Sequence, residues 1–150
     1  MANVYWTRSL VPILKKSTSF ARSSLMIAAA ATHGDVTICG CIPTHMEALT
    51  AKLLEMGARV EERDDAIRVR SLGAHRAVTF KTQVYPGFPT DLQAPMMAVA
   101  CKTPGTSVFL ETIFENRFMH AAELSRLGAH IRVENRVAVV EGTPYLTGAP

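Results

Sequence analysis

The segment YPGFPTDLQ, residues 85–93, lies between two copies of a longer pattern, and the rest of the chain is arranged around it. Its two prolines each fix φ near about −65° and hold the preceding residue in an extended conformation. The apolar run APMMAVA follows at residues 94–100. Pro95 has no backbone N–H, so it fits only the first turn of a helix. The pattern therefore predicts a helix that begins around residues 92–94, with Asp91 immediately before it.

Asp91 allows two interpretations. Asp is among the preferred N-cap residues, so its side chain can serve only to accept a hydrogen bond from a free N–H group of the helix. A carboxylate at this position also faces the positive end of the helix dipole and stays ionised, which makes Asp91 the most suggestive carboxylate in the chain. Spacing alone favours the cap.

The chain ahead of this segment alternates between helix and strand. Residues 25–31 are rich in alanine and predict a helix, which ends where Gly34 can adopt the left-handed conformation. Residues 35–39 alternate apolar and polar side chains, as a half-buried strand does. We expect Val36 and Ile38 to face the core.

A second helix and a hairpin follow. The sequence THME at residues 44–47 matches a capping box, in which Thr and Glu satisfy two free N–H groups. Apolar residues at helical spacing come next, and Gly57 stops the helix. Residues 58–62 and 66–70 predict a β-hairpin, and residues 76–81 predict a further short strand.

The same order of elements recurs at an offset of 71 residues, at which Gly57 lies over Gly128 (128 − 57). The second copy also ends in a predicted hairpin, at residues 130–140. A repeat of this kind is a helix–strand–helix–hairpin unit that buries its apolar faces against its neighbours. We expect an α/β (α+β) fold with two such units, at about residues 24–80 and 90–142. Other pairs that coincide are Ile38 with Phe109, Leu53 with Leu124, Met56 with Leu127, Val60 with Ile131 and Val69 with Val140.

Composition narrows the class of protein. The 150 residues, 48% of them hydrophobic, suit one modest domain with a real core. No window approaches the roughly 18 apolar residues that a membrane span requires. The three cysteines and five histidines lack the spacing of a metal site or a redox motif. We therefore expect a cytoplasmic protein with reduced thiols, no cofactor, no metal and no membrane contact.

Residues 1–23 differ from the rest of the chain. Four cations and no acid precede Asp35, and the whole chain carries +3, so residues 35–150 carry −1 (3 − 4). This nearly neutral body offers no general basic surface, which argues against a nucleic-acid partner. We expect residues 1–23 to be a poorly ordered extension, outside the domain at residues 24–150.

Two longer motifs carry a resemblance to a known family. YPGFPTDLQA at residues 85–94 and ETIFENRFMH at residues 111–120, with LGA at residues 127–129, resemble the enolpyruvyl transferases, and among them the UDP-N-acetylglucosamine 1-carboxyvinyltransferases. The resemblance covers roughly residues 24–150. It implies part of one lobe of an inverse α/β barrel, with helices inward, sheets outward and ligands in the cleft between two lobes. It also implies the transfer of enolpyruvate from phosphoenolpyruvate to the 3-hydroxyl of UDP-N-acetylglucosamine, the first committed step of peptidoglycan synthesis.

The resemblance implies roles for four residues. Asp91 is implied as the catalytic carboxylate near the sugar hydroxyl, and it also binds substrate. Ile113 and Phe114 are implied to hold the nucleotide sugar. Arg117 is implied to lie near the cleft, where a guanidinium can meet anionic ligand oxygens.

The residues themselves leave other readings open. Ile113 and Phe114 are otherwise plain core residues. Arg117 is otherwise a cation on a helix surface, or a structural partner for Glu111 or Glu115.

The chain also departs from the family's pattern. The family's enzymes are well over twice this length, and their Lys-Asn pair, their catalytic cysteine loop and the arginines that bind phosphoenolpyruvate find no match in this sequence. We therefore expect an incomplete copy that spans two units of one lobe. It is either an enzyme segment that acts only with its missing parts or a non-catalytic remnant that at most binds a ligand or a partner. Exposed unit edges imply self-association.

Overall fold

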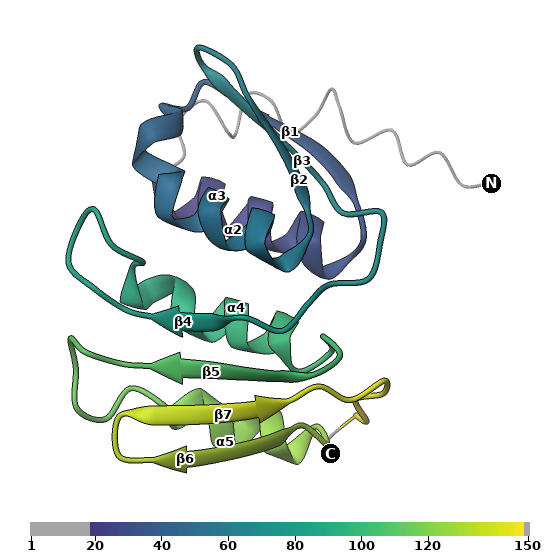
Figure 1. The fold of residues 1–150 in the computed structure, drawn as a ribbon, viewed down its shortest axis with the longest axis vertical. Coiled ribbons are helices and arrows are strands. Elements are labelled where there is room, and N and C mark those ends of the chain that lie inside the picture. Colours follow the sequence, from purple (N-terminus) through teal and green to yellow (C-terminus); the bar gives the residue numbers. More distant parts are fainter. Residues whose placement is uncertain (1–18, 149–150) are drawn as a thin grey trace.

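Two β-sheets and their helices form the described part of the chain, residues 19–148, in this computed structural model (Figure 1). The two units follow one another along the long axis of the molecule. The predicted extension at residues 1–23 lies outside the described residues up to residue 18, whereas residues 19–23 belong to the first helix. None of the helices within residues 19–148 is long and apolar enough to cross a membrane.

The first unit contains a three-stranded antiparallel sheet in the order β1-β3-β2. The predicted strand, helix and hairpin are confirmed with small shifts of their ends. The elements are α2 (Ser19–Ala31), β1 (Asp35–Cys39), the 3-10 helix η1 (Pro43–Met46), α3 (Glu47–Met56), β2 (Arg59–Glu62) and β3 (Ala66–Arg70).

The second unit contains a four-stranded sheet in the order β4-β5-β7-β6. Strand β4 pairs parallel with β5, and the other pairs are antiparallel. Strand β4 lies at the end of the first repeat in sequence. Because its hydrogen-bonded partner is β5, it nevertheless belongs to the second sheet. The elements are β4 (Thr79–Lys81), the 3-10 helix η2 (Thr90–Leu92), α4 (Gln93–Ala100), β5 (Thr106–Leu110), α5 (Met119–Arg126), β6 (His130–Glu134) and β7 (Val137–Glu141).

The registers of the two sheets confirm the repeat. Ile38 pairs with Ile67 in the first sheet, and Phe109 pairs with Ala138 in the second. Both members of the second pair lie 71 positions after those of the first (109 − 38 and 138 − 67). Because a slip of one residue would turn every side chain to the opposite face, this agreement places equivalent apolar residues toward the core in both units.

The predicted left-handed residues at the helix ends are confirmed after α3 and α5 but not after α2. Gly57 and Gly128 follow α3 and α5 with φ of 101° and 90°, as their shared position in the repeat predicts. The prediction that Gly34 takes the left-handed conformation is wrong. His33 adopts it instead, with φ of 51°, and its ring stacks on that of His75 at 5.4 Å between centroids. The preceding residue thus turns the chain before Gly34 is reached.

The predicted capping box is also absent. Pro43 opens the 3-10 helix η1, so Thr44 lies inside a helical turn rather than ahead of one. The N-cap of α3 is Met46, and no side chain hydrogen bonds to the cap position.

Asp91 does not cap α4. It lies within η2, and the N-cap of α4 is Leu92, without a side-chain cap hydrogen bond. The carbonyl of Pro89 accepts a hydrogen bond from the N–H of Leu92, and the carbonyl of Thr90 accepts one from the N–H of Gln93. Because backbone carbonyls take up these donors, the Asp91 side chain is left to contact other groups.

One core of buried aromatic and aliphatic side chains extends through both units. The rings of Phe80 on β4 and Phe109 on β5 stack at 4.6 Å between centroids, and both are almost fully buried. Helices α2 and α4, which occupy equivalent places in the two copies, pack against each other. The core is therefore continuous across the repeat, and it fixes the segment that joins β4 to α4.

Candidate functional site

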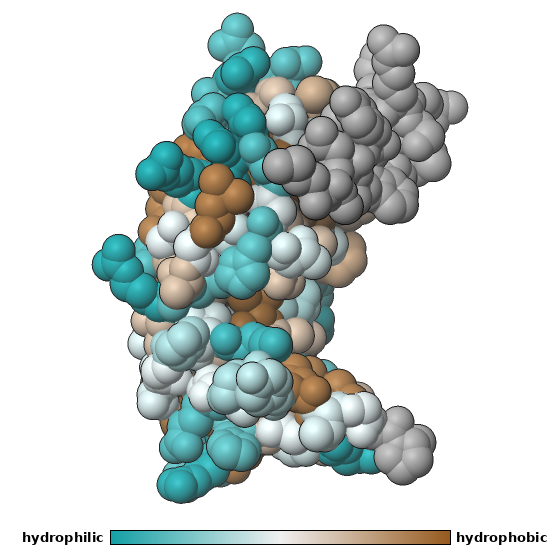
Figure 2. All heavy atoms as spheres, turned by 90° about the vertical axis from the view of Figure 1, so that its right-hand side faces the viewer, coloured by the Kyte–Doolittle hydropathy of each residue, from teal (hydrophilic) through white to brown (hydrophobic). Residues whose placement is uncertain are grey.

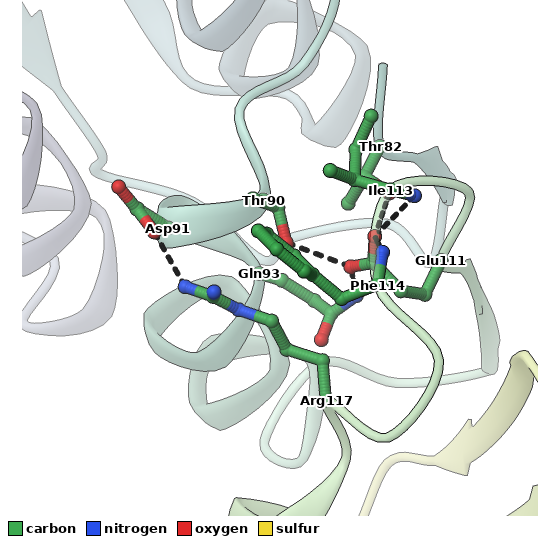
Figure 3. A network of polar contacts seen from close by, with 8 residues as sticks. All are labelled: Thr82, Thr90, Asp91, Gln93, Glu111, Ile113, Phe114 and Arg117. Carbon is green, nitrogen blue, oxygen red and sulfur yellow. Dashed lines mark hydrogen bonds and ion pairs between the residues drawn. The ribbon is translucent and has the colours of Figure 1, made fainter. Parts of the chain in front are cut away.

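An ion pair joins the two motifs that the sequence singled out. Nη2 of Arg117, in the loop between β5 and α5, donates to Oδ1 of Asp91 in η2 (Figure 3). The side chains of Arg117 and Asp91 are 36% and 64% exposed. Exposed pairs of this kind contribute only about 0.2–1 kcal/mol to folding. The pair therefore matters chiefly for where it places a carboxylate and a guanidinium.

The other two predicted site residues lie in the same loop. The guanidinium carbon of Arg117 lies 4.9 Å from the centre of the Phe114 ring, a cation–π contact. Phe114 is 47% exposed, so it is not a core residue. Ile113 is partly buried and takes part through its backbone N–H, which donates to Glu111 over 2.7 Å. The structure thus brings Asp91, Phe114 and Arg117 together, with Ile113 behind them.

A groove of about 590 Å³ opens beside this pair. A second, smaller one of about 170 Å³ lies beside the segment of residues 85–92, and Asp91 lines both. The Asp91 carboxylate therefore lies between the two grooves. The larger groove is lined by Thr90, Asp91, Gln93, Ala94, Phe114, Glu115, Asn116, Arg117, Met119 and His120.

Two polar atoms of the groove-lining residues are buried without a hydrogen-bond partner, Oε1 of Gln93 and Nε2 of His120. Burial lowers the pKa of His120, which a hydrogen bond with the Arg117 backbone partly opposes. A neutral imidazole and an amide oxygen can both accept hydrogen bonds. The groove is thus lined by an exposed cation and carboxylate, with two neutral acceptor atoms buried in its wall.

Behind the ion pair lies a buried carboxylate that sequence reasoning did not select. Glu111, at the end of β5, is 1% exposed, and its two oxygens accept five hydrogen bonds (Figure 3). Oε1 accepts from Thr82 Oγ1 at 2.8 Å, Ile113 N at 2.7 Å and Phe114 N at 3.1 Å, and Oε2 accepts from Thr90 Oγ1 at 2.8 Å and Gln93 Nε2 at 2.7 Å.

These hydrogen bonds determine the charge of Glu111. Burial by itself raises the pKa of a carboxyl group because it penalises the charged form. The donors, led by the Thr90 hydroxyl and the Ile113 N–H, outweigh burial and lower the pKa of Glu111 below its ordinary value. Glu111 is therefore an ionised, fully hydrogen-bonded carboxylate inside the protein at neutral pH.

Residues 19–150 match the family described as EPSP synthase (3-phosphoshikimate 1-carboxyvinyltransferase). The chain belongs to this family. The matched residues include both motifs of the site, so the ion pair and the Glu111 network lie within the matched part of the chain, which runs from α2 to the last residue.

Within the EPSP synthase family, the chain is similar to curated enzymes named UDP-N-acetylglucosamine 1-carboxyvinyltransferase. The one from Desulfofundulus thermocisternus is 55% identical over 126 residues, which are 84% of this chain and 52% of the relative. Enzyme 3 from Caldanaerobacter subterraneus subsp. tengcongensis is 54% identical over 125 residues, which are 83% of this chain and 30% of the relative. The chain thus spans between about a third and half of the length of these relatives.

Solved structures confirm the fold of the family. The enolpyruvyl transferase NikO from Streptomyces tendae superposes with a TM-score of 0.75 at 23% identity, over 87% of this chain and 31% of that one. EPSP synthase from Acinetobacter baumannii gives a TM-score of 0.65 at 14% identity, over 87% of this chain and 30% of that one. At these identities the likeness concerns the fold alone.

The structure matches neither of the structural alternatives for Arg117, which lies in a loop rather than on a helix. Its ion pair is with Asp91 rather than with either nearby glutamate. Glu115 instead contacts Arg136 over 3.1 Å, and Glu111 accepts from neutral donors. A weak signal for Glu111 was present in the sequence, because an acid that directly follows the apolar residues 108–110 must be paired or hydrogen-bonded if it is buried.

The cysteines stay apart from the site. Cys41 and Cys101 are buried and Cys39 is exposed, and all three are free. Burial raises the pKa of the Cys101 thiol to about 11, so this group is not a ready nucleophile. Within residues 19–148, no three His, Cys, Asp or Glu side chains gather as a metal site.

Proposed function

We propose that this chain forms the nucleotide-sugar side of a carboxyvinyltransferase site. Together with the rest of such an enzyme, it would transfer enolpyruvate from phosphoenolpyruvate to the 3-hydroxyl of UDP-N-acetylglucosamine. The observation that carries the proposal is the Asp91–Arg117 pair, which joins the two family motifs at the edge of the large groove. The names of the relatives at 54–55% identity support the choice of nucleotide sugar over shikimate 3-phosphate.

Asp91 is the residue to which we assign the base. In the addition step, Oδ2 of Asp91 removes the proton of the sugar 3-hydroxyl while the sugar oxygen bonds to C2 of phosphoenolpyruvate, and C3 takes up a proton from an acid outside this chain. In the elimination step, C3 gives a proton back to the conjugate base of that external acid, the double bond re-forms and the C2–O bond to phosphate breaks, and the departing phosphate takes the proton that Asp91 holds. The products are the enolpyruvyl ether and inorganic phosphate, so atoms and charge balance.

The remaining three residues position the nucleotide sugar. Arg117 already contacts Oδ1 of Asp91, and its guanidinium has donors left for anionic oxygens of a ligand. Phe114, half exposed beneath that guanidinium, offers an apolar face to the ligand. Ile113 is fixed through its N–H by Glu111, which orients its backbone in the same loop.

The proposed reaction belongs to peptidoglycan synthesis and cell wall biogenesis, and so to the maintenance of cell shape and to cell division. We place it in the cytoplasm. The substrates of the complete enzyme would be UDP-N-acetylglucosamine and phosphoenolpyruvate, without a cofactor.

We also propose that isolated copies associate with one another. A groove of about 650 Å³ runs between α2 and α4, and its lining is mainly apolar. Figure 2 shows the molecule from its side, where the surface is hollowed between the two units and apolar atoms are visible. Helix α4 packs against the equivalent helix α2 of the first unit. A third helix of the same kind could pack against both, and we expect a helix of a second copy to cover the groove in this way.

A binding experiment on the purified chain tests the site. Calorimetric titration with UDP-N-acetylglucosamine should detect binding that Arg117→Ala weakens. Arg68→Ala is the matched control, since Arg68 forms an exposed ion pair with Asp35 in the first unit, away from the groove. Binding that both variants leave unchanged, or preferential binding of shikimate 3-phosphate, would overturn the proposal.

A turnover experiment tests the reaction. The chain is mixed with UDP-N-acetylglucosamine, phosphoenolpyruvate and a separately produced remaining part of a relative, and released phosphate is measured. We expect no turnover by the chain alone, because half of a cleft cannot orient two substrates. Turnover in the mixture that Asp91→Asn abolishes would support the assignment of the base, and full turnover by that variant would contradict it.

A further inference from the structure

We propose that Glu111 is a positioning residue: its carboxylate ties the loop that carries Phe114 and Arg117 to the segment that carries Asp91, so that the ion pair forms. That the ion pair serves a substrate site rests on the function proposed above. That Glu111 connects the two segments rests only on its hydrogen bonds, and this connection can be tested without a substrate.

The five donors come from three parts of the chain. Thr82 follows β4, Thr90 and Gln93 lie in η2 and at the start of α4, and Ile113 and Phe114 precede Arg117 in the loop before α5. Oε2 accepts only from the segment around Asp91, whereas Oε1 accepts from the Arg117 loop and from Thr82. One side chain therefore bridges both sides of the ion pair.

A second link runs beside the first. The N–H of Thr112 donates to Oγ1 of Thr82 over 2.9 Å, and the Thr112 hydroxyl donates to the Thr82 carbonyl. These contacts hold the base of the loop to the end of β4. They do not reach Thr90, Asp91 or Gln93, so among the side-chain hydrogen bonds of the described residues those of Glu111 make the direct connection across the ion pair.

The length of the Glu111 side chain is essential to this connection. Aspartate keeps the charge but is shorter by one methylene, so its oxygens cannot remain on both sets of donors. Glutamine keeps the length, and its oxygen can serve the two loop N–H groups. Its amide can donate to the Thr90 hydroxyl and, after rotation of the Gln93 amide, to the otherwise unpartnered Oε1 of Gln93. Positioning therefore predicts that glutamine is tolerated better than aspartate, whereas a purely electrostatic role predicts the reverse.

The decisive experiment measures the ion pair by NMR in the full chain. In the native protein, Asp91→Asn should shift the Nε–Hε signal of Arg117, because the two side chains are in contact. In a Glu111→Asp background we expect this shift to be lost, and in a Glu111→Gln background we expect it to persist. A shift that Glu111→Asp leaves intact would refute the positioning role.

A double-mutant cycle on ligand binding gives the second readout. We expect Glu111→Asp to weaken binding of UDP-N-acetylglucosamine by about tenfold in the native background and by little in the Arg117→Ala background, since coupled residues are non-additive. Equal losses in both backgrounds would show a merely structural role. Glu123→Asp is the control, because Glu123 is an exposed residue of α5 that pairs with Arg126.

The two readouts separate the two proposals. If the native chain binds no nucleotide sugar but its Arg117 signal responds to Asp91→Asn only while residue 111 is Glu or Gln, the proposed function fails and the positioning role stands. If binding occurs and Glu111→Asp weakens it equally in both Arg117 backgrounds, the positioning role fails and the proposed function stands.

Discussion

Asp91 and Arg117 lie 26 positions apart in the chain and form an ion pair between the 3-10 helix η2 and the loop before α5. Neither side chain is buried. The core below them is shared by both units and includes the stacked rings of Phe80 and Phe109. An exposed pair is thus held by a rigid framework, which is the arrangement expected of residues that meet a ligand.

Replacement of Asp91 distinguishes a base from a cap. Since no cap hydrogen bond is present in the structure, we expect Asp91→Asn and Asp91→Ala to lower the unfolding free energy equally, by no more than the ~0.2–1 kcal/mol of the exposed ion pair, measured by urea denaturation. Grafted into a complete relative, Asp91→Asn should lower turnover by roughly 10²–10⁴-fold, the usual contribution of a general base. A loss of about 1 kcal/mol in Asp91→Ala that Asp91→Asn does not share, together with full turnover in Asp91→Asn, would identify a cap instead.

The lowered pKa of Glu111 predicts how stability depends on pH. A carboxyl group whose pKa is lower in the folded state than in the unfolded state stabilises the fold above its unfolded pKa. This contribution is lost as the pH falls through the folded pKa, which lies below 4.5 for Glu111. We therefore expect native protein to exceed Glu111→Gln in unfolding free energy at pH 7, and the gap to close below about pH 4.5. A gap that is constant from pH 7 to pH 3 would contradict this.

The left-handed glycine after α3 offers a test of backbone strain. Gly57 has φ of 101°, so Gly57→Ala should lower the unfolding free energy by about 1–2 kcal/mol. Gly73 is the matched control, because an added Cβ would meet nothing within 4 Å and its φ is not positive. Gly73→Ala should be neutral or slightly stabilising. Thermal unfolding of the two variants compares them directly, and equal losses would mean that strain at Gly57 is not the cause.

Self-association is tested by adding a charge to the groove between α2 and α4. Ala98 lines this groove and is exposed on α4. Ala98→Glu should shift the chain toward monomer in sedimentation velocity at high concentration, because a charge opposes burial of the groove. Ala122→Glu places the same charge on the exposed side of α5 and should leave association unchanged. A native chain that is monomeric at all concentrations would exclude the interface.

The repeated units could be predicted from the sequence because their signals are local. Left-handed glycines such as Gly57 and Gly128 and strands such as β1 and β5 follow from spacing and alternation alone, and the 71-residue offset carries the register from one sheet to the other. The helix starts could not be predicted equally well. Short 3-10 helices precede α3 and α4, so the N-caps are Met46 and Leu92, two residues after Thr44 and one residue after Asp91.

The site could be predicted only in part. The resemblance selected Asp91 and Arg117 as separate residues, but their contact depends on how the Arg117 loop folds back onto η2, which no local pattern records. Glu111 was missed as a site residue because its partners include backbone N–H groups and hydroxyls from three segments. A carboxylate that serves other protein groups has no sequence motif of its own.

The parallel pairing of β4 with β5 bears on how segments could be exchanged between relatives. Because β4 belongs by pairing to the second sheet, a boundary drawn between the repeats at residues 82–90 would remove an edge strand from one partner and leave the Phe109 ring without Phe80. A junction within residues 72–78, which precede β4 and contain no helix or strand, keeps that strand with its sheet. Chimaeras of this family should therefore carry the last strand of one repeat together with the next repeat as a single exchangeable block.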